Sequence, residues 1–152
     1  MVLQTIAYFG VIVLDRLLKW LVESRMYPGQ SIAVAPFLHI TLVHNTGAAF
    51  GFLRGLQPLL AVLGLLVGVG VFWIARRVPP REAGLRVALG AVGGGAIGNF
   101  IDRVAYGHVL DFVDLRIWPV FNLADSAIFL GGLYLAWRLL LRQGSPGVVI
   151  EP

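Results

Sequence analysis

Apolar residues are concentrated in four stretches of the chain, each close to the length that a helix needs to cross a lipid bilayer. The stretches cover residues 2–22, 58–74, 84–104 and 118–141, and a transmembrane helix needs roughly 20 predominantly apolar residues. The first stretch has no basic leading segment and no small-residue cleavage site, so we interpret it as a retained span rather than a signal peptide. The pattern predicts an all-α membrane protein with four transmembrane helices in one integral membrane domain, residues 1–152.

Between the first two spans the pattern changes from helical to alternating. Apolar residues recur at every second position in two short runs separated by a proline. They are Ile32 and Val34, and then Leu38, Ile40 and Leu42. Because such alternation is typical of strands, we expect two short strands within residues 31–43. They would form a small extracytoplasmic sheet that rests on the lipid surface or covers the mouth of a site.

Glycines recur at four-residue intervals in two of the predicted spans. Gly90, Gly94 and Gly98 lie in the third span, and Gly64 and Gly68 lie in the second. This spacing lets membrane helices approach each other closely. We therefore interpret these glycines as helix contacts.

Arginines predict the orientation of the spans. The segment between the second and third spans and the end of the fourth span are rich in them: Arg76, Arg77, Arg81, Arg86, Arg138 and Arg142. Basic segments stay on the cytoplasmic side, so we expect both termini in the cytoplasm and the loops 23–57 and 105–117 outside. The outer loops also contain arginines, so the bias is moderate. Residues 144–152 have Gly and Pro without periodicity and are expected to be a disordered tail.

Composition supports the membrane class and excludes several others. Hydrophobic residues make up 58% of the chain and charged residues 13%, with a mean hydropathy of +0.83, whereas globular domains are about 25% charged. The chain has no cysteine, which excludes disulfides and thiolate chemistry. The net charge of +4 comes from basic residues near span ends, where they contact anionic lipid. We expect membrane lipid as a partner and no nucleic acid.

Polar residues converge near the outer ends of the third and fourth spans. Asn99, Asp102 and Arg103 are spaced i, i+3 and i+4, so they share one helix face. Asn122 and Asp125 are spaced i, i+3 at the start of the fourth span. The short outer loop between these helix ends carries Asp111 and should place it above or between them. Ionisable residues inside membranes are costly and usually functional.

Other interpretations of these groups remain open at this point. One alternative is that Asn122 or Asp125 caps a helix N-terminus, which does not exclude a catalytic role. For Arg103 we favour a structural ion pair that holds the loop. Asp114 lies beside Arg116 and is interpreted as a solvated surface charge.

The charged residues of the first span have ordinary interpretations. Asp15 and Lys19 are spaced i, i+4 and predict a helical ion pair. Arg16 is expected to extend its side chain to the membrane interface. Both interpretations are structural rather than catalytic.

Asp111 and Asp125 are the best candidates for catalysis. Two carboxylates a few ångströms apart in a site of low dielectric share one proton. The ionised one can take a proton from water while the protonated one polarises a carbonyl, as in aspartic proteases. This chemistry needs no metal and no cofactor, and His39, His44 and His108 lack metal-ligand spacing.

Two rival functions explain less of the sequence. In a small transporter or channel, buried Asp and Arg would form an ion path, but the polar residues stop at the outer leaflet. A membrane scaffold built on close helix packing leaves Asp111 and Asp125 without a role.

Five sequence blocks occur in a fixed order along the chain. The blocks are Leu14-Asp-Arg-Leu-Leu-Lys-Trp20, His44-Asn-Thr-Gly-Ala-Ala-Phe-Gly51, Gly94-Gly-Ala-Ile-Gly-Asn-Phe-Ile-Asp-Arg103, Val109-Leu-Asp-Phe112 and Pro119-Val-Phe-Asn-Leu-Ala-Asp-Ser-Ala-Ile128. Each block alone is weak, but all five in this order are specific. From about residue 12 to residue 141 the chain resembles the bacterial lipoprotein signal peptidases, also called signal peptidase II.

The resemblance implies an aspartic endopeptidase of the cytoplasmic membrane. It would cleave the signal peptide from prolipoproteins, just before a cysteine that carries a diacylglyceryl group. The catalytic pair would be Asp111 and Asp125. Residues that shape the site or hold substrate backbone would be Asn45, Asn99, Asp102, Arg103 and Asn122, with Asp15 and Lys19 in structural roles. The implied fold is a four-helix membrane bundle with a small outer β-cradle and a short helical segment over the active site.

Overall fold

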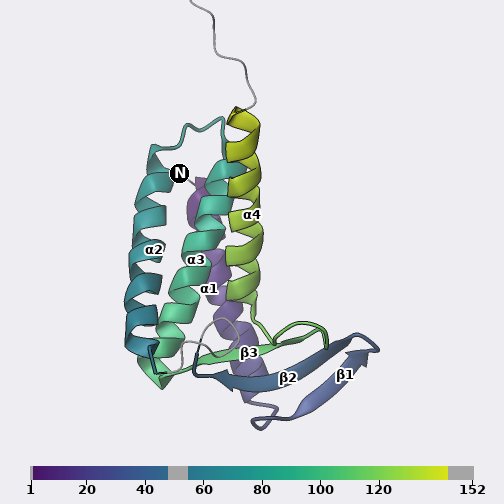
Figure 1. Ribbon diagram of the computed structural model, residues 1–152. Coiled ribbons are helices and arrows are strands. Elements are labelled where there is room, and N and C mark those ends of the chain that lie inside the picture. The colour runs from purple at the N-terminus through teal and green to yellow at the C-terminus, as the bar shows by residue number, and fades with distance from the viewer. Residues whose placement is uncertain (1, 48–54, 144–152) are drawn as a thin grey trace, which may run out of the picture.

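Four long helices run side by side, and a three-stranded sheet lies across one end of them in the computed structural model (Figure 1). The structure describes residues 2–47 and 55–143. The elements in chain order are α1 (Val2–Glu23), β1 (Ser31–Ala35), β2 (Leu38–Asn45), α2 (Gln57–Arg77), α3 (Ala83–Tyr106), β3 (Val109–Asp114) and α4 (Leu123–Gln143). The predicted tail, 144–152, lies outside the described residues, as do residues 48–54 of the first outer loop.

Three of the helices are long and apolar enough to cross a membrane by length and composition: α2, α3 and α4. Helix α1 has 22 residues, but Asp15, Arg16 and Lys19 interrupt its apolar sequence. The start of α1, the α2–α3 connection and the end of α4 lie at one end of the bundle, opposite the sheet (Figure 1). The helix bounds agree with the predicted spans except at the fourth.

The fourth predicted span began too early. Helix α4 starts at Leu123 rather than at residue 118. The residues before it are apolar but extended, and Phe121 forms a β-bridge with Val113. Hydropathy alone does not distinguish an apolar strand-like segment from the first turn of a helix.

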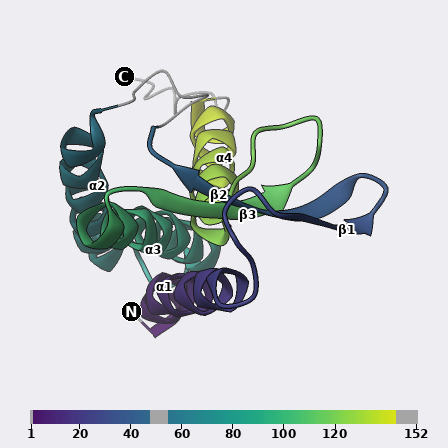
Figure 2. The ribbon, with the colours of Figure 1, turned by 90° about the horizontal axis from the view of Figure 1, so that it is seen from below.

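Helix α3 is the central helix of the bundle. It packs against α1, α2 and α4, and the view from the sheet end shows the other three around it (Figure 2). Its glycines explain the close approach, because a Cβ atom on Gly90 would lie 2.5 Å from the Gln4 carbonyl oxygen in α1. A Cβ atom on Gly68 of α2 would lie 2.5 Å from the Ile97 side chain of α3. The predicted role of these glycines in helix contacts is confirmed.

The sheet has three antiparallel strands in the order β1-β2-β3, one more than predicted. The two strands expected within 31–43 are present as β1 and β2. The third strand was not predicted: within the connection 105–117, residues 109–114 form β3 and pair with β2. Strand β3 is buried on both faces except at Val113, so it lacks the apolar–polar alternation of a half-exposed strand.

A small apolar core joins the sheet to the end of α1. Leu42 of β2 and Leu110 and Phe112 of β3 form its centre, and Val22 and Met26 pack against them. This contact holds β3 across the ends of the helices (Figure 2), which places the residues of β3 beside the polar ends of α3 and α4.

Replacing Gly90 with Ala should destabilise the bundle, because the new methyl group meets backbone of α1 that cannot move without separating the helices. Overpacking of this kind costs about 1–3 kcal/mol. Gly70→Ala in α2 is the matched control, since nothing lies within 4 Å of its added Cβ. Thermal unfolding in detergent should show a lower midpoint for Gly90→Ala only, and equal midpoints would contradict this packing.

Candidate active site

The start of α4 is fixed by two polar side chains that cap each other's backbone. The side-chain Oδ1 of Asn122 accepts a hydrogen bond from the Asp125 backbone N–H at 2.8 Å. In return, the Asn122 N–H donates to Asp125 Oδ2 at 3.4 Å. This reciprocal arrangement is a capping box, so both residues cap the helix as one of the sequence interpretations proposed. It also holds the Asp125 carboxylate at the helix N-terminus, where negative charge is favoured.

The side-chain amide of Asn122 also reaches the other predicted carboxylate. Its Nδ2 donates to Asp111 Oδ1 at 2.7 Å and lies 3.1 Å from Asn99 Oδ1. A third contact, of 3.3 Å, goes to the Leu110 carbonyl oxygen. Asn122 is fully buried, so α4, β3 and α3 meet at this one amide.

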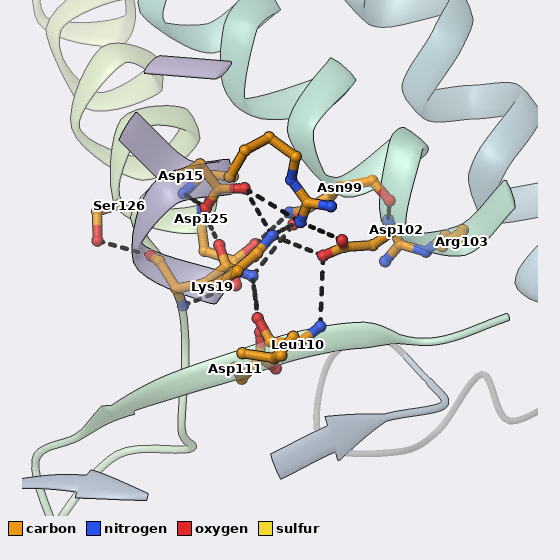
Figure 3. A network of polar contacts seen from close by, with 12 residues as sticks. Asp15, Lys19, Asn99, Asp102, Arg103, Leu110, Asp111, Asp125 and Ser126 are labelled. Atoms are coloured by element: carbon orange, nitrogen blue, oxygen red, sulfur yellow. Dashed lines mark hydrogen bonds and ion pairs between the residues drawn. The ribbon is translucent and has the colours of Figure 1, made fainter. Parts of the chain in front are cut away.

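Two further amides hold the carboxylates. Asn99 Nδ2 of α3 donates to Asp125 Oδ1 at 2.6 Å. Asn45 Nδ2, at the end of β2, donates to Asp111 Oδ2 at 2.8 Å. The Asn45 side chain also accepts the Gly47 N–H. The structure therefore brings together Asp111, Asp125 and three of the predicted surrounding residues, and Figure 3 shows Asn99 beside the two aspartates.

Beside these amides lies a network of four charged residues, of which Asp15, Lys19 and Asp102 are buried and Arg16 is partly exposed. Lys19 Nζ lies 2.7 Å from Asp15 Oδ2 and 2.6 Å from Asp102 Oδ2. Arg16 forms a second ion pair with Asp102. Two cations thus balance two anions, which is what buried charges require. Arg16, which was expected to extend to the membrane interface, turns toward Asp102 instead. The predicted ion pair between Asp15 and Lys19 is confirmed, and both residues are buried.

This network positions the chain segments that carry the catalytic candidates. Asp15 Oδ1 accepts the Ala124 N–H, in the first turn of α4, at 3.0 Å. Asp102 Oδ2 accepts the Leu110 N–H, next to Asp111, at 3.3 Å. Lys19 also donates to Asn99 Oδ1 at 3.3 Å. The charged network and the amides form one connected set of contacts (Figure 3).

A cavity of about 680 Å³ opens beside the two aspartates. Its polar lining includes Asn45, Arg103, Asp111, Asp125 and Ser126. Its apolar lining comes from the loop before α4 and from α4 itself: Leu115, Trp118, Pro119, Val120, Phe121, Phe129 and Leu130. The loop before α4 therefore gives an apolar wall to a cavity that the two carboxylates also line.

Arg103 lines this cavity but does not form the ion pair expected for it. Its Nη1 donates to the Asn99 carbonyl oxygen at 3.3 Å. Among the described residues its Nε has no hydrogen-bond partner, and no carboxylate lies within 4.0 Å of its guanidinium. Arg103 is therefore a cation beside the aspartates with donor capacity left for a ligand.

The pKa of Asp111 is raised to about 7, chiefly because the carboxyl group is buried and also because the charge of Asp125 lies nearby. The hydrogen bonds from Asn45 and Asn122 act in the opposite sense because they stabilise the ionised form. Asp111 is 1% exposed. It can therefore hold a proton at neutral pH beside a second carboxylate.

Two smaller features were not foreseen from the sequence. Asp114 is buried rather than solvated, and it accepts hydrogen bonds from Thr41 and Arg116, so its interpretation as a surface charge was wrong. The rings of His44 and His108 stack with centroids 4.1 Å apart. In the part of the chain that the structure describes, no three His, Cys, Asp or Glu residues are grouped to hold a metal.

Comparison with known proteins identifies the family. The model described as signal peptidase (SPase) II matches residues 7–141. A lipoprotein signal peptidase of Moorella thermoacetica is 44% identical over 138 residues, which are 90% of this chain and 92% of that protein. One of Pelotomaculum thermopropionicum is 44% identical over 131 residues, 86% of each chain. The chain belongs to the signal peptidase II family.

Solved structures agree with this assignment. Two chains described as bacterial membrane enzymes have TM-scores of 0.87 and 0.81 to this signal peptidase. The first is 30% identical in sequence, and the matched region covers 96% of this chain and 93% of the solved chain. The second is 32% identical, and the matched region covers 90% of this chain and 92% of the solved chain. The protein is thus an integral membrane enzyme.

Replacing Asn45 with Ala removes one of the two amide donors to Asp111, so the pKa of Asp111 should rise above its value of about 7. We expect the alkaline limb of the pH–activity profile to move to higher pH. Activity near neutral pH should fall clearly, while the thermal unfolding midpoint should change little. If the thermal midpoint falls in step with activity and the profile keeps its position, Asn45 serves only to form the turn.

Proposed function

We propose that the enzyme removes signal peptides from prolipoproteins through a shared-proton pair, Asp111 and Asp125. The observation that carries this proposal is the set of neutral amides that hold both carboxylates at the cavity. Neutral donors orient the carboxylates without adding the positive charge that would keep both ionised. The relatives are named lipoprotein signal peptidases, which supports a prolipoprotein substrate.

In the resting state Asp111 holds the shared proton and Asp125 is ionised. Supporting this division, Asp111 is the more buried of the two and its pKa is raised to about 7. Asp125 lies at the N-terminus of α4, where the helix dipole stabilises a carboxylate. The assignment describes the pair at neutral pH, since the two groups titrate together.

The reaction then follows from these positions. Asp125 takes a proton from water as the water oxygen adds to the scissile carbonyl carbon, while Asp111 donates its proton to the carbonyl oxygen. When the tetrahedral intermediate collapses, Asp111 regains a proton from that oxygen and Asp125 gives its proton to the leaving amine. The peptide bond breaks, and the pair returns with one proton. Arg103 lines the cavity, and its Nε has no hydrogen-bond partner within residues 2–47 and 55–143; in this reaction it binds a substrate backbone carbonyl.

We further propose that all four helices span the cytoplasmic membrane and that the sheet lies outside it. Helix α1 is long enough, and its charged residues are neutralised inside the bundle by the pairs with Asp102. The end with Arg76, Arg77 and Arg81 is cytoplasmic by the positive-inside rule. Both termini are then cytoplasmic, and the active site is near the outer leaflet.

The cavity suits a substrate that is part peptide and part lipid. The two aspartates line it together with apolar side chains such as Trp118 and Phe129. A diacylglyceryl group on the cysteine after the scissile bond can extend along the apolar wall into the bilayer. The leaving amine is then that of the lipidated cysteine.

Replacing either Asp111 or Asp125 with Asn should abolish cleavage without unfolding the protein. Asn is nearly isosteric but cannot exchange the proton, and losing half of a coupled pair removes nearly all the rate. Turnover of a diacylglyceryl-modified prolipoprotein, followed by gel shift, should fall by at least about a thousandfold. Glu23→Gln is the control, a carboxylate of α1 that is 50% exposed and should leave turnover unchanged. Substantial turnover by either Asn variant would remove that aspartate from the mechanism.

The lipid on the substrate should strongly increase its cleavage. Each buried CH₂ group contributes about 0.8 kcal/mol, and the anchor also brings the scissile bond into attack geometry. We expect kcat/KM for the diacylglyceryl-modified precursor to exceed that of the same precursor with a bare cysteine by more than about a hundredfold. Equal values for the two precursors would show that the lipid is not recognised.

A further inference from the structure

Four polar side chains form a continuous chain of hydrogen bonds on one face of the sheet, outside the active site. Ser31 of β1 pairs with Thr41 of β2, and His39 of β2 pairs with Asp114 of β3. His39 Nδ1 lies 3.2 Å from Ser31 Oγ, which lies 2.7 Å from Thr41 Oγ1. Thr41 Oγ1 lies 2.8 Å from Asp114 Oδ2. The chain links all three strands.

The number of available hydrogens fixes the direction of every bond in this chain. Hydrogen bonds, first of all from the Arg116 backbone N–H, keep the pKa of Asp114 below its usual value, so its carboxylate only accepts. Thr41 has a single hydroxyl hydrogen and gives it to Asp114, so Thr41 must accept from Ser31. Ser31 then has no hydrogen left for His39. His39 must therefore carry a proton on Nδ1 and donate it to Ser31.

Asp114 connects this chain to the wall of the cavity. Its Oδ1 accepts the Arg116 backbone N–H at 2.8 Å, and its Oδ2 accepts Arg116 Nη1 at 3.2 Å. Arg116 has φ of 64°, the only positive φ of a non-glycine residue in the described chain. Such a conformation is uncommon and persists only where surrounding contacts impose it.

The turn at Arg116 is the beginning of the loop that forms the apolar wall of the cavity. The loop is closed at its other end by the bridge between Val113 and Phe121. Five of its residues line the cavity: Leu115, Trp118, Pro119, Val120 and Phe121. Its shape thus depends on Asp114 at one end and on the bridge at the other.

We infer that Asp114 is a positioning residue for the signal peptidase reaction: it sets the apolar wall that binds the lipidated substrate, and the His39–Ser31–Thr41 chain holds it in place. This inference rests on the proposed function. Asp114 does not touch the reacting atoms, so it acts on substrate binding rather than on the chemical step. Loss of Asp114 should weaken binding equally in the ground state and the transition state, which raises KM and leaves kcat nearly unchanged.

Steady-state kinetics with a diacylglyceryl-modified prolipoprotein tests the inference. Asp114→Ala should raise KM by about tenfold with kcat within about twofold of the wild type. Thr41→Val, which is close in shape but lacks the hydroxyl, should raise KM by about threefold, and Thr41→Ser should restore it. The control Ser24→Ala removes an exposed hydroxyl bond to the Leu21 carbonyl outside this chain and should match the wild type.

A spectroscopic measurement tests the direction of the chain. With ¹⁵N-labelled histidine, wild-type His39 should show a protonated Nδ1. In Asp114→Asn, which offers an amide donor to Thr41, the chain can reverse, and His39 should then become an acceptor at Nδ1. A deprotonated Nδ1 in the wild type would overturn the proposed direction.

The outcomes separate this inference from the proposed function. A wild-type enzyme that does not cleave the precursor refutes the proposed function. An active wild type, together with Asp114→Ala and Thr41→Val variants whose KM is unchanged, refutes the positioning role. A fall in kcat that follows the folded fraction, with KM unchanged, would likewise mean that Asp114 only stabilises the sheet. If Asp114→Ala does not fold, the milder Thr41→Val and Thr41→Ser pair decides between these outcomes.

Discussion

A charge buried among apolar helices must meet an opposite charge and hydrogen-bond donors, and this requirement organises the end of the bundle that lies next to the sheet. Asp15 and Asp102 are 0% and 1% exposed and share Lys19, and Arg16 completes the balance of charge. Removing one partner of such a group leaves a buried charge uncompensated, at a cost of about 3–5 kcal/mol. These contacts therefore fix α1 against α3 and, through Asp15 and the Ala124 N–H, against α4.

The two candidate catalytic carboxylates have neutral hydrogen-bond donors, whereas the structural carboxylates Asp15 and Asp102 have cations as partners. Asp111 and Asp125 are held by the neutral amides of Asn45, Asn99 and Asn122, and no described cation forms an ion pair with either. A cation in direct contact would stabilise the doubly ionised pair and remove the proton that the proposed reaction shares. The charged network instead reaches the pair indirectly, through Lys19 on Asn99. Rigid positioning and an easily exchanged proton are thus provided by separate groups.

The sequence predicted the helices well and their polar ends less well. The glycine spacing in α3 correctly indicated helix contacts, because the backbone approach it allows depends on local sequence alone. Strand β3 was missed because both of its faces are buried, so its residues do not alternate. The start of α4 was placed five residues early, because hydropathy does not detect the capping box of Asn122 and Asp125.

By itself, the sequence determined the membrane class, the lengths of the helices and the identity of the residues able to do the chemistry, since these follow from hydropathy, periodicity and side-chain type. Only the tertiary structure decided which of those residues share contacts. Asp102 pairs with Arg16 across 86 positions of the chain, and Asp114 accepts from Thr41 across 73. Neither spacing carries a local signal, because both pairs form only when packed helices and strands bring distant segments together and burial makes an unpaired charge too costly.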